Sequence, residues 1–289
     1  MGTGNNEVSN AEHKKSIFVA EDNDDLRNLL LELFENEGYE VTGASDGRVA
    51  QDLLKRQYFD LVLLDLGLPT VGGLEILQGL QHKPNGQKVI VMTGDDTTQT
   101  ILQLVRGQAC HLISKPATRS AYLEAVQNAL EQTSELMPIE IVSAKADWVE
   151  LLVPCQLEVA DRLQSFILGM NAKLSQEVRE SIGIAFRELL MNAIEWGGKL
   201  DASRKVRIAC LRSDRILQYR IQDPGPGFKP DDLKHAAVSN DPEHPYAHMA
   251  ARTEKGLRSG GFGLLMTHTL VDELIYNEAH NEVVFIKYL

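Results

Sequence analysis

Residues 221–228 read IQDPGPGF, and this stretch decides how the second half of the chain is interpreted. Apolar residues alternate with polar ones at Leu217, Tyr219 and Ile221, which predicts a β-strand. The strand ends at Asp223, and two glycines follow, each of them after a proline. Glycine has no side chain, so the backbone there can approach a ligand closely. The stretch predicts a ligand site at the end of a strand, and a plain turn is the alternative.

Two further segments carry residues suited to the same site. FRELLMNAIEW, at residues 186–196, places Glu188, Asn192 and Glu195 at spacings i, i+4 and i+7, on one face of an α-helix. SGGFG, at residues 259–263, opens an apolar run that predicts another helix, and amides at a helix start suit phosphate oxygens. Each segment alone is a weak signal, and solvated helix residues are the alternative for the first. The order of helix, DxGxG turn and glycine group is a much stronger signal.

In this order, the three segments resemble the GHKL ATPase superfamily and, within it, the anti-sigma-factor serine kinases. The resemblance covers roughly residues 139–289 and implies an α+β two-layer sandwich that binds ATP and Mg²⁺. It implies that Asn192 is a Mg²⁺ ligand, that Glu188 is the general base, and that Asp223 accepts a hydrogen bond from adenine. The remaining implied nucleotide contacts are Gly225, Gly227, Lys255, Arg258, Gly260, Gly261 and Gly263.

Two features of the second half bear on this resemblance. Residues 229–259 would form a lid over the nucleotide. Within it, Lys255 and Arg258 are candidates for phosphate contacts, and exposure of both charges to solvent is an equal alternative. Trp196 stands where many anti-sigma kinases carry His or Arg, in a position near the expected nucleotide. ATP binding therefore follows more directly from the resemblance than full kinase activity does.

The second half of the chain mixes strands and helices without regular alternation, which predicts an α+β fold. We expect a helix to follow the glycine group and to run through Leu274. The other predicted elements are strands at 148–154, 206–211, 217–223 and 282–288, and helices at 159–174 and 176–196.

The first half of the chain alternates strand and helix patterns five times, which predicts a doubly wound α/β sheet. Its strands are short apolar runs such as SIFVA at 16–20, FDLVLLD at 59–65 and VIVMT at 89–93. Such runs are apolar on both faces, as buried parallel strands should be. Ligands bind beyond the C-terminal ends of the strands in this architecture. Polar residues at those ends are therefore candidates for a site.

Five polar residues lie at these strand ends, and we expect them to converge: Glu21, Asp22, Asp65, Thr93 and Lys115. Oxygen ligands bind Mg²⁺, so two carboxylates can hold the metal while the third attacks a phosphoryl group. The metal and the lysine together offset the charge on the phosphoryl oxygens. Ordinary polar strand ends are the alternative, but they do not account for five suitable types in this order.

This pattern resembles the response-regulator receiver domains, which have a flavodoxin-like fold, over roughly residues 15–135. The resemblance implies that Asp65 accepts the phosphoryl group. It also implies that Glu21 and Asp22 bind Mg²⁺ together with Asp65 and the backbone carbonyl of Gly67. In the same comparison, the switch hydroxyl and the phosphate-binding lysine are Thr93 and Lys115.

The chain departs from the receiver pattern three residues before the lysine. Receivers usually carry Tyr or Phe there, and this chain has Leu112, preceded by His111. His111 is a candidate substitute for the aromatic residue, and a structural role is the alternative. The helix expected at 119–135 leads into the second half, so we expect it to transmit the effect of phosphorylation. Its apolar stripe packs on the receiver or forms a homodimer contact, and the sequence leaves both open.

The whole chain has 289 residues and a formal net charge of −12, which favours two domains and argues against a nucleic-acid surface. Its three cysteines form no metal-binding pair and fit a reducing cytoplasm. No apolar run reaches the ~18 residues of a membrane span. We expect a disordered tail at 1–15, a receiver domain at 16–135, a linker at 136–148 and an ATPase domain at 149–289.

These expectations lead to two hypotheses about function. In the first, the chain is a response regulator whose output is an ATP-dependent serine/threonine protein kinase of the anti-sigma type, gated by phosphorylation of Asp65. By resemblance to bacterial partner switching, its partners are a sensor histidine kinase, a STAS anti-sigma antagonist and a sigma factor. In the second, the ATPase-like domain binds nucleotide and sequesters a partner without kinase activity. A sensor histidine kinase itself is excluded, because none of the eight histidines precedes an acidic residue as a phosphorylated histidine commonly does.

Overall fold

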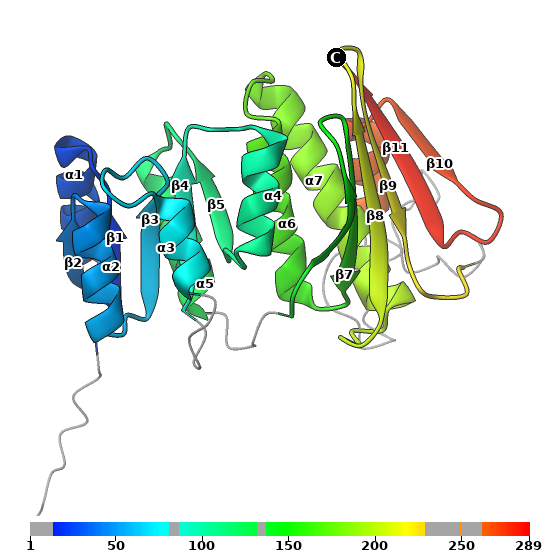
Figure 1. Ribbon diagram of the computed structural model, residues 1–289. Helices are drawn as coiled ribbons and strands as arrows, with labels where there is room; N and C mark the ends of the chain where they lie inside the picture. Colours follow the sequence, from blue (N-terminus) through cyan, green and yellow to red (C-terminus); the bar gives the residue numbers. More distant parts are fainter. Residues whose placement is uncertain (1–13, 81–86, 132–136, 229–248, 250–261) are drawn as a thin grey trace, which may run out of the picture. The chain divides into compact units, whose positions relative to one another are not determined.

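The computed structural model describes residues 14–80, 87–131, 137–228, 249 and 262–289. Its packing divides the chain into two compact units, Met1–Lys88 and Val89–Leu289. Figure 1 follows the chain from blue to red through both units. The division falls inside the first sheet, because the strand at 111–114 and the helix at 98–106, which follow Lys88, pack against the helix at 157–170.

The first sheet has five strands within the described residues, in the order β2-β1-β3-β4-β5. Strand β1 pairs in parallel with β2 and β3, and β4 pairs in parallel with β5. The strand order reverses direction at β1, which confirms the predicted doubly wound, flavodoxin-like α/β fold. The strands are β1 (Ser16–Ala20), β2 (Glu40–Ala44), β3 (Leu61–Asp65), β4 (Val89–Thr93) and β5 (His111–Ser114). The helices are α1 (Asp24–Asn36), α2 (Gly47–Arg56), α3 (Gly73–Leu80), α4 (Thr98–Arg106) and α5 (Arg119–Glu131).

Burial and helix caps explain these elements. Strands β3 and β4 are buried at every position, as their continuous apolar runs require. Helix α1 begins after Asn23, whose side chain accepts a hydrogen bond from the N–H of Leu26. It ends before Gly38, whose φ of +89° suits glycine. The carboxylate of Asp46 caps α2 in the same way as Asn23 caps α1. The caps thus fix where these two helices begin.

The second sheet has six strands in the part of the chain that the structure describes, in the order β10-β11-β9-β8-β7-β6. Every neighbouring pair is antiparallel, and helices α6, α7 and α9 accompany the sheet, so the predicted α+β fold is confirmed. The strands are β6 (Glu140–Ala144), β7 (Trp148–Pro154), β8 (Lys205–Arg212), β9 (Ile216–Gln222), β10 (Glu273–Tyr276) and β11 (Glu282–Tyr288). The helices are α6 (Leu157–Met170), α7 (Gln176–Asn192) and α9 (Gly263–Leu270).

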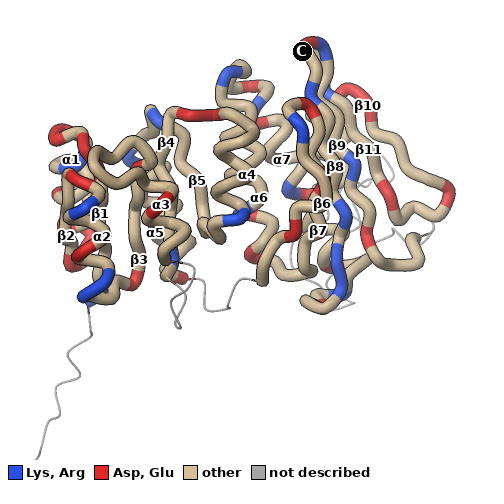
Figure 2. The backbone as a smooth tube through the Cα atoms, viewed as in Figure 1, with Lys and Arg blue, Asp and Glu red and all other residues tan. Residues whose placement is uncertain are grey.

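Acidic and basic positions are interspersed along the strands of this sheet (Figure 2). Cross-strand ion pairs account for the pattern, because Arg220 of β9 pairs with Glu282 of β11 and Arg207 of β8 pairs with Glu150 of β7. Among the described residues, no helix is both long and apolar enough to cross a membrane.

The predicted helix through Leu274 is wrong, because α9 ends at Leu270 and Leu274 lies in strand β10. The backbone becomes extended at Val271, and the N–H of Asp272 donates to the carbonyl of Ile286 at 3.0 Å. Leu274 then pairs with Phe285 of β11. The sheet thus provides hydrogen-bond partners that a continued helix would not use. The stretch expected to be a linker, 136–148, likewise contains the edge strand β6.

The helix predicted at 176–196 is formed, but its last turn is not an α-helix. The chain is α-helical to Asn192 and then forms a π-helix over Ala193–Gly197, so Glu195 is not at the α-helical position that its spacing predicted. The N–H of Gly198 donates to the carbonyl of Ala193 at 2.8 Å, five residues earlier. Single π-turns are rare and often lie at functional sites. This one lies at the end of the helix that carries Glu188.

Helix α6 lies along strand β5 and helix α4 (Figure 1). Nε of Arg162 donates to the carbonyl of Ala109 at 2.8 Å, and Oγ of Ser165 accepts from the N–H of Leu112 at 3.2 Å. A Cβ on Gly169 would overlap Cδ2 of Leu112, so a larger residue there would require the Leu112 side chain to shift. Leu112 stands where receivers usually carry an aromatic switch. Its backbone and its side chain both contact α6.

A second set of contacts ties the loop after β4 to the same half of the chain. Nζ of Lys173, just after α6, lies 3.0 Å from Oδ1 of Asp96. The hydroxyl of Thr98 donates to the carbonyl of Ala146 at 3.4 Å. This loop begins directly after Thr93, so the strand that carries the predicted switch hydroxyl leads into contacts with the second sheet.

Candidate functional site

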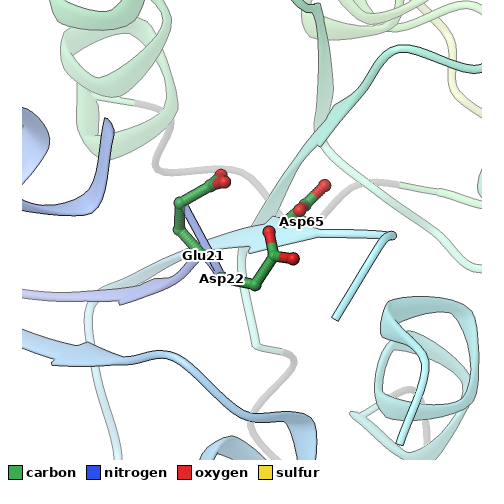
Figure 3. Close-up of side chains that lie close together, drawn as sticks. All are labelled: Glu21, Asp22 and Asp65. Carbon is green, nitrogen blue, oxygen red and sulfur yellow. The ribbon is translucent and has the colours of Figure 1, made fainter. Parts of the chain in front are cut away.

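Three carboxylates lie together at the C-terminal ends of β1 and β3 (Figure 3). Glu21 and Asp22 follow β1, Asp65 ends β3, and the two strands are parallel neighbours. One carboxylate oxygen from each residue lies within 4.8 Å of the others. Glu21 and Asp65 are buried and Asp22 is exposed, so the cluster opens to solvent on one side. Clustered carboxylate oxygens fit a hard divalent cation such as Mg²⁺, and these three residues would hold it.

Backbone geometry sets the position of this cluster. The backbone carbonyl of Glu21 accepts a hydrogen bond from Nη1 of Arg27 at 2.9 Å. The Glu21 carboxylate accepts a hydrogen bond from the N–H of Asn23 at 3.3 Å. A Cβ built on Gly67 would lie 3.4 Å from Oδ2 of Asp65, so Gly67 is next to the predicted phosphoacceptor. The three carboxylates and Gly67 are thus neighbours, as the sequence predicts.

Thr93 and Lys115 form a second pair at the ends of β4 and β5. The N–H of Lys115 donates to the carbonyl of Thr93 at 2.8 Å. The Thr93 side chain is 6% exposed, and its hydroxyl accepts from the N–H of Asp95 at 3.0 Å. The structure therefore brings these two predicted residues together. Their approach to Asp65 stays a prediction.

Asp223, at the end of β9, is held from several sides. Its N–H donates to the carbonyl of Asn281 at 2.9 Å, and its carboxylate accepts from the N–H of Gly225 at 2.6 Å. Burial raises the pKa of Asp223, while the Gly225 N–H and the Arg204 guanidinium oppose the rise. A Cβ on Gly197, in the π-turn, would overlap the Asp223 carboxylate. The carboxylate therefore lies tightly against the end of the helix that carries Asn192.

The DPGPG turn after Asp223 is clamped by residues that sequence reasoning missed. Nη2 of Arg204 donates to the carbonyl of Pro224 at 2.6 Å, and Nδ2 of Asn281 donates to the carbonyl of Gly225 at 3.1 Å. Gly227 has φ +84°, and a Cβ there would overlap the carbonyl of Ala279. Nothing in the spacing of Arg204 or Asn281 signals this role, because both come from loops distant in sequence.

Glu188 and Gly263 meet where α7 packs against α9. A Cβ on Gly263 would overlap Oε2 of Glu188, so the carboxylate lies against the first residue of α9. Oε1 of the same carboxylate lies 3.8 Å from Nη1 of Arg187. Asn192, one turn after Glu188, is half-buried at the end of α7. The structure thus brings the helix face and the end of the glycine group together, as the sequence predicts.

The remaining predicted nucleotide residues are only in part described. Trp196 is 46% exposed and lies in the π-turn next to Gly197. The predicted contacts in the lid and at the start of the glycine group lie outside the described residues: Lys255, Arg258, Gly260 and Gly261.

Two protein families match this chain in succession. Residues 17–127 match the Response regulator receiver domain family. Residues 153–287 match the Histidine kinase-like ATPase domain family. The two matched ranges follow the two sheets, and the described residues between them include the end of α5, strand β6 and most of β7.

Three named relatives are each similar to part of this chain, with 41% of it matched for CqsS and 67% of it for AtoC. Sporulation initiation phosphotransferase F of Bacillus subtilis is 31% identical over 116 residues, which are 40% of this chain and 94% of that protein. The CAI-1 autoinducer sensor kinase/phosphatase CqsS of Vibrio cholerae is 33% identical over 122 residues, and the chain spans only 18% of its length. Regulatory protein AtoC of Escherichia coli is 24% identical, and the chain spans 42% of its length.

One solved structure is similar to part of this chain. A CheY-like response regulator receiver domain protein from Methanospirillum hungatei JF-1 covers 41% of this chain and 95% of its own, with 26% identity and a TM-score of 0.40. The carboxylate cluster, the parallel sheet and the two family matches agree in their order along the chain. The chain therefore belongs to the response regulator receiver family over residues 17–127 and carries a histidine kinase-like ATPase domain over residues 153–287.

Proposed function

We propose that this signalling protein is an ATP-dependent serine/threonine protein kinase of the anti-sigma type, whose activity is gated by phosphorylation of Asp65. The observation that carries the proposal is the meeting of Glu188 with Gly263 at the start of α9. This arrangement places a carboxylate beside a helix start suited to phosphate oxygens. A carboxylate in that position suits a general base for a hydroxyl nucleophile that attacks the terminal phosphoryl group.

In the receiver half, Asp65 acts as the nucleophile of a phosphoryl transfer. One of its carboxylate oxygens bonds to phosphorus while the bond between phosphorus and the donor breaks, which leaves an acyl phosphate. Receiver domains take this group from sensor histidine kinases, so we propose such a kinase as the donor. Glu21 and Asp22 would hold Mg²⁺ beside Asp65, and the ion would offset the charge on the phosphoryl oxygens.

In the ATPase half, Asp223 recognises the adenine and Glu188 acts as the general base. The Asp223 carboxylate accepts from the adenine amino group, in a turn that Arg204 and Asn281 hold rigid. Glu188 takes the proton of a serine or threonine hydroxyl of the substrate. The hydroxyl oxygen bonds to the γ-phosphorus of ATP while the bond between that phosphorus and ADP breaks. The amide oxygen of Asn192 is a hard donor suited to Mg²⁺ at the nucleotide.

The proposed substrate is a STAS anti-sigma antagonist, with a sigma factor as a further partner. This assignment comes from the resemblance of the second domain to anti-sigma-factor kinases. The same resemblance leaves sequestration without chemistry as the competing activity, so the test must separate binding from phosphotransfer.

The test incubates the full chain with γ-labelled ATP, Mg²⁺ and a purified STAS protein. We expect label on a serine or threonine of the STAS protein. Glu188→Gln should retain ADP affinity, because Asp223 and Asn192 remain, and should lower phosphotransfer by roughly 10²-fold or more. A parent protein that binds the STAS protein tightly and transfers no label would overturn the kinase assignment in favour of sequestration.

A further inference from the structure

A row of charged side chains leads across α6 and α7 to Glu188. Nε of Arg187 lies 2.6 Å from Oδ1 of Asp161, an ion pair between α7 and α6. Nη1 of the same guanidinium lies 3.8 Å from Oε1 of Glu188. One nitrogen of the Arg187 guanidinium thus contacts the Asp161 carboxylate on the neighbouring helix, and another faces the candidate base.

Helix geometry alone does not produce the contact between Arg187 and Glu188. Residues next to each other in a helix do not face each other, because their side chains leave the axis about 100° apart. Asp161 draws the guanidinium to the side where α6 and α7 pack, and from there it reaches back to Glu188. The two oxygens of Glu188 then have different neighbours, since Oε1 faces Arg187 and Oε2 lies against Gly263.

We propose that Arg187, held by Asp161, is a positioning residue that aims the Glu188 carboxylate at the start of α9. The inference rests on the proposed role of Glu188 as the general base. Asp161 fixes the guanidinium, the guanidinium restrains Oε1, and Oε2 is left at Gly263. Catalysis depends on such restraint, because a displacement of about 1 Å can lower a rate by roughly 10²-fold.

Stability alone does not explain this pair. The Arg187 and Asp161 side chains are 34% and 46% exposed, and ion pairs with such exposure contribute little to the stability of a fold. Arg187→Gln is therefore expected to fold, which keeps the proposal testable. The ion pair between Arg220 and Glu282 offers a matched control, since Arg220 is also an exposed arginine and lies away from Glu188 on the second sheet.

The pair also connects Glu188 with the receiver. Asp161 belongs to α6, the helix that packs along β5, and its carboxylate acts electrostatically on His111 of β5. A shift of β5 relative to α6 would therefore change the surroundings of Asp161, and with them the restraint on Glu188.

The experiment uses the full chain in six forms: the parent, Arg187→Gln, Arg187→Lys, Glu188→Gln, the Arg187→Gln/Glu188→Gln double variant and Arg220→Gln. Two quantities are measured for each, the ADP dissociation constant and the rate of ATP turnover. We expect Arg187→Gln to lower turnover about tenfold or more while the dissociation constant stays within about twofold. The double variant should be no slower than Glu188→Gln alone, because Arg187 acts through Glu188. Arg187→Lys should recover part of the loss, and Arg220→Gln should match the parent.

A crystal structure of each ADP complex gives a readout that does not depend on turnover. In the parent, Glu188 should lie between Arg187 and Gly263, and in Arg187→Gln it should turn away from Gly263. Full activity of Arg187→Gln together with an inactive Glu188→Gln would overturn the positioning role and leave the base intact. Full activity of Glu188→Gln would instead overturn the proposed function. If the parent has no turnover, an unmoved Glu188 in the Arg187→Gln crystal overturns the inference, and a displaced one supports it.

Discussion

The carboxylate cluster of the receiver and the nucleotide region of the ATPase domain are built in different ways. Glu21, Asp22 and Asp65 leave the ends of two paired parallel strands, so pairing alone brings them together. Glu188 and Asp223 come from a helix and from the turn after a strand. Their positions depend on the packing of α7 against α9 and on a clamped turn. A site at strand ends is therefore easier to read from sequence than one assembled by packing.

The largest effect is expected at Asp65. A small phosphodonor with Mg²⁺ should add one phosphoryl group to the parent, and Asp65→Asn should remove this labelling altogether, because the amide is not a nucleophile for it. Intact-protein mass spectrometry measures the added phosphate. Asp25→Asn, an exposed carboxylate at the start of α1, is the matched control and should label as the parent does. Persistent labelling of Asp65→Asn would place the phosphoacceptor elsewhere.

A smaller effect is expected at Asp223. Asp223→Ala should weaken ATP and ADP binding by about 1.5–3 kcal/mol, because a charge-assisted hydrogen bond to adenine is lost. The parent should also prefer ATP to GTP, and the variant should lose much of that preference. Calorimetric titration measures both, with Asp214→Asn, in the exposed turn between β8 and β9, as the control. Unchanged affinity in Asp223→Ala would mean that the adenine does not bind at this turn.

The smallest effect concerns His111, beside α6. Burial lowers the pKa of His111 from 6.5 to about 4, although the Asp161 carboxylate opposes the change. The unfolded chain therefore binds this proton more readily than the folded chain. The contribution of the neutral His111 imidazole to the free energy of unfolding is fully present above pH 6.5 and is lost as the pH falls toward 4. We expect this loss to be about 1–2 kcal/mol after allowance for solvent screening.

Denaturant unfolding at a series of pH values measures this difference between the parent and His111→Gln. The free energy of unfolding of the parent should fall more steeply in the acid range than that of the variant. Parallel profiles would show that His111 is as easily protonated in the folded chain as in the unfolded one.

The sequence predicted more of the first region than of the second. Continuous apolar runs such as β3 marked the parallel strands, and the polar residue at each strand end then followed directly. In the second region, the identity of Glu188 and Asp223 was readable from spacing. Arg204 and Asn281 were not, because hydrogen bonds to carbonyl groups leave no periodic pattern.

The errors in the second region have physical causes of the same kind. Leu274 lies in an apolar run that fits a helix, but pairing with β11 draws it into a strand. Residues Ala193–Gly197 form a π-turn, although their sequence pattern predicts a regular α-helix. Both are decided by contacts with other elements, and local spacing does not record them.

The contacts of α6 offer a second route between the two regions, beside the one expected from the sequence. The sequence pointed to the helix at 119–135, because that helix leads into the second half. In the structure, α6 packs along β5 and α4, with Ser165 and Gly169 against Leu112. The loop after Thr93 is tied to the same half through Asp96 and Lys173. We therefore expect α6 to carry the coupling between phosphorylation and ATP turnover.

The central claim is that the state of Asp65 controls the ATPase domain. Its most direct test is the rate of ATP turnover by the unmodified chain, by the chain with beryllofluoride bound at the receiver, and by Asp65→Asn in the presence of beryllofluoride. Ordinary coupling between sites is about 1–3 kcal/mol, so we expect the beryllofluoride complex to differ from the unmodified chain by several-fold to a hundredfold. Asp65→Asn should match the unmodified chain. Equal rates in all three forms would contradict the claim and would mean that the receiver does not gate the ATPase domain.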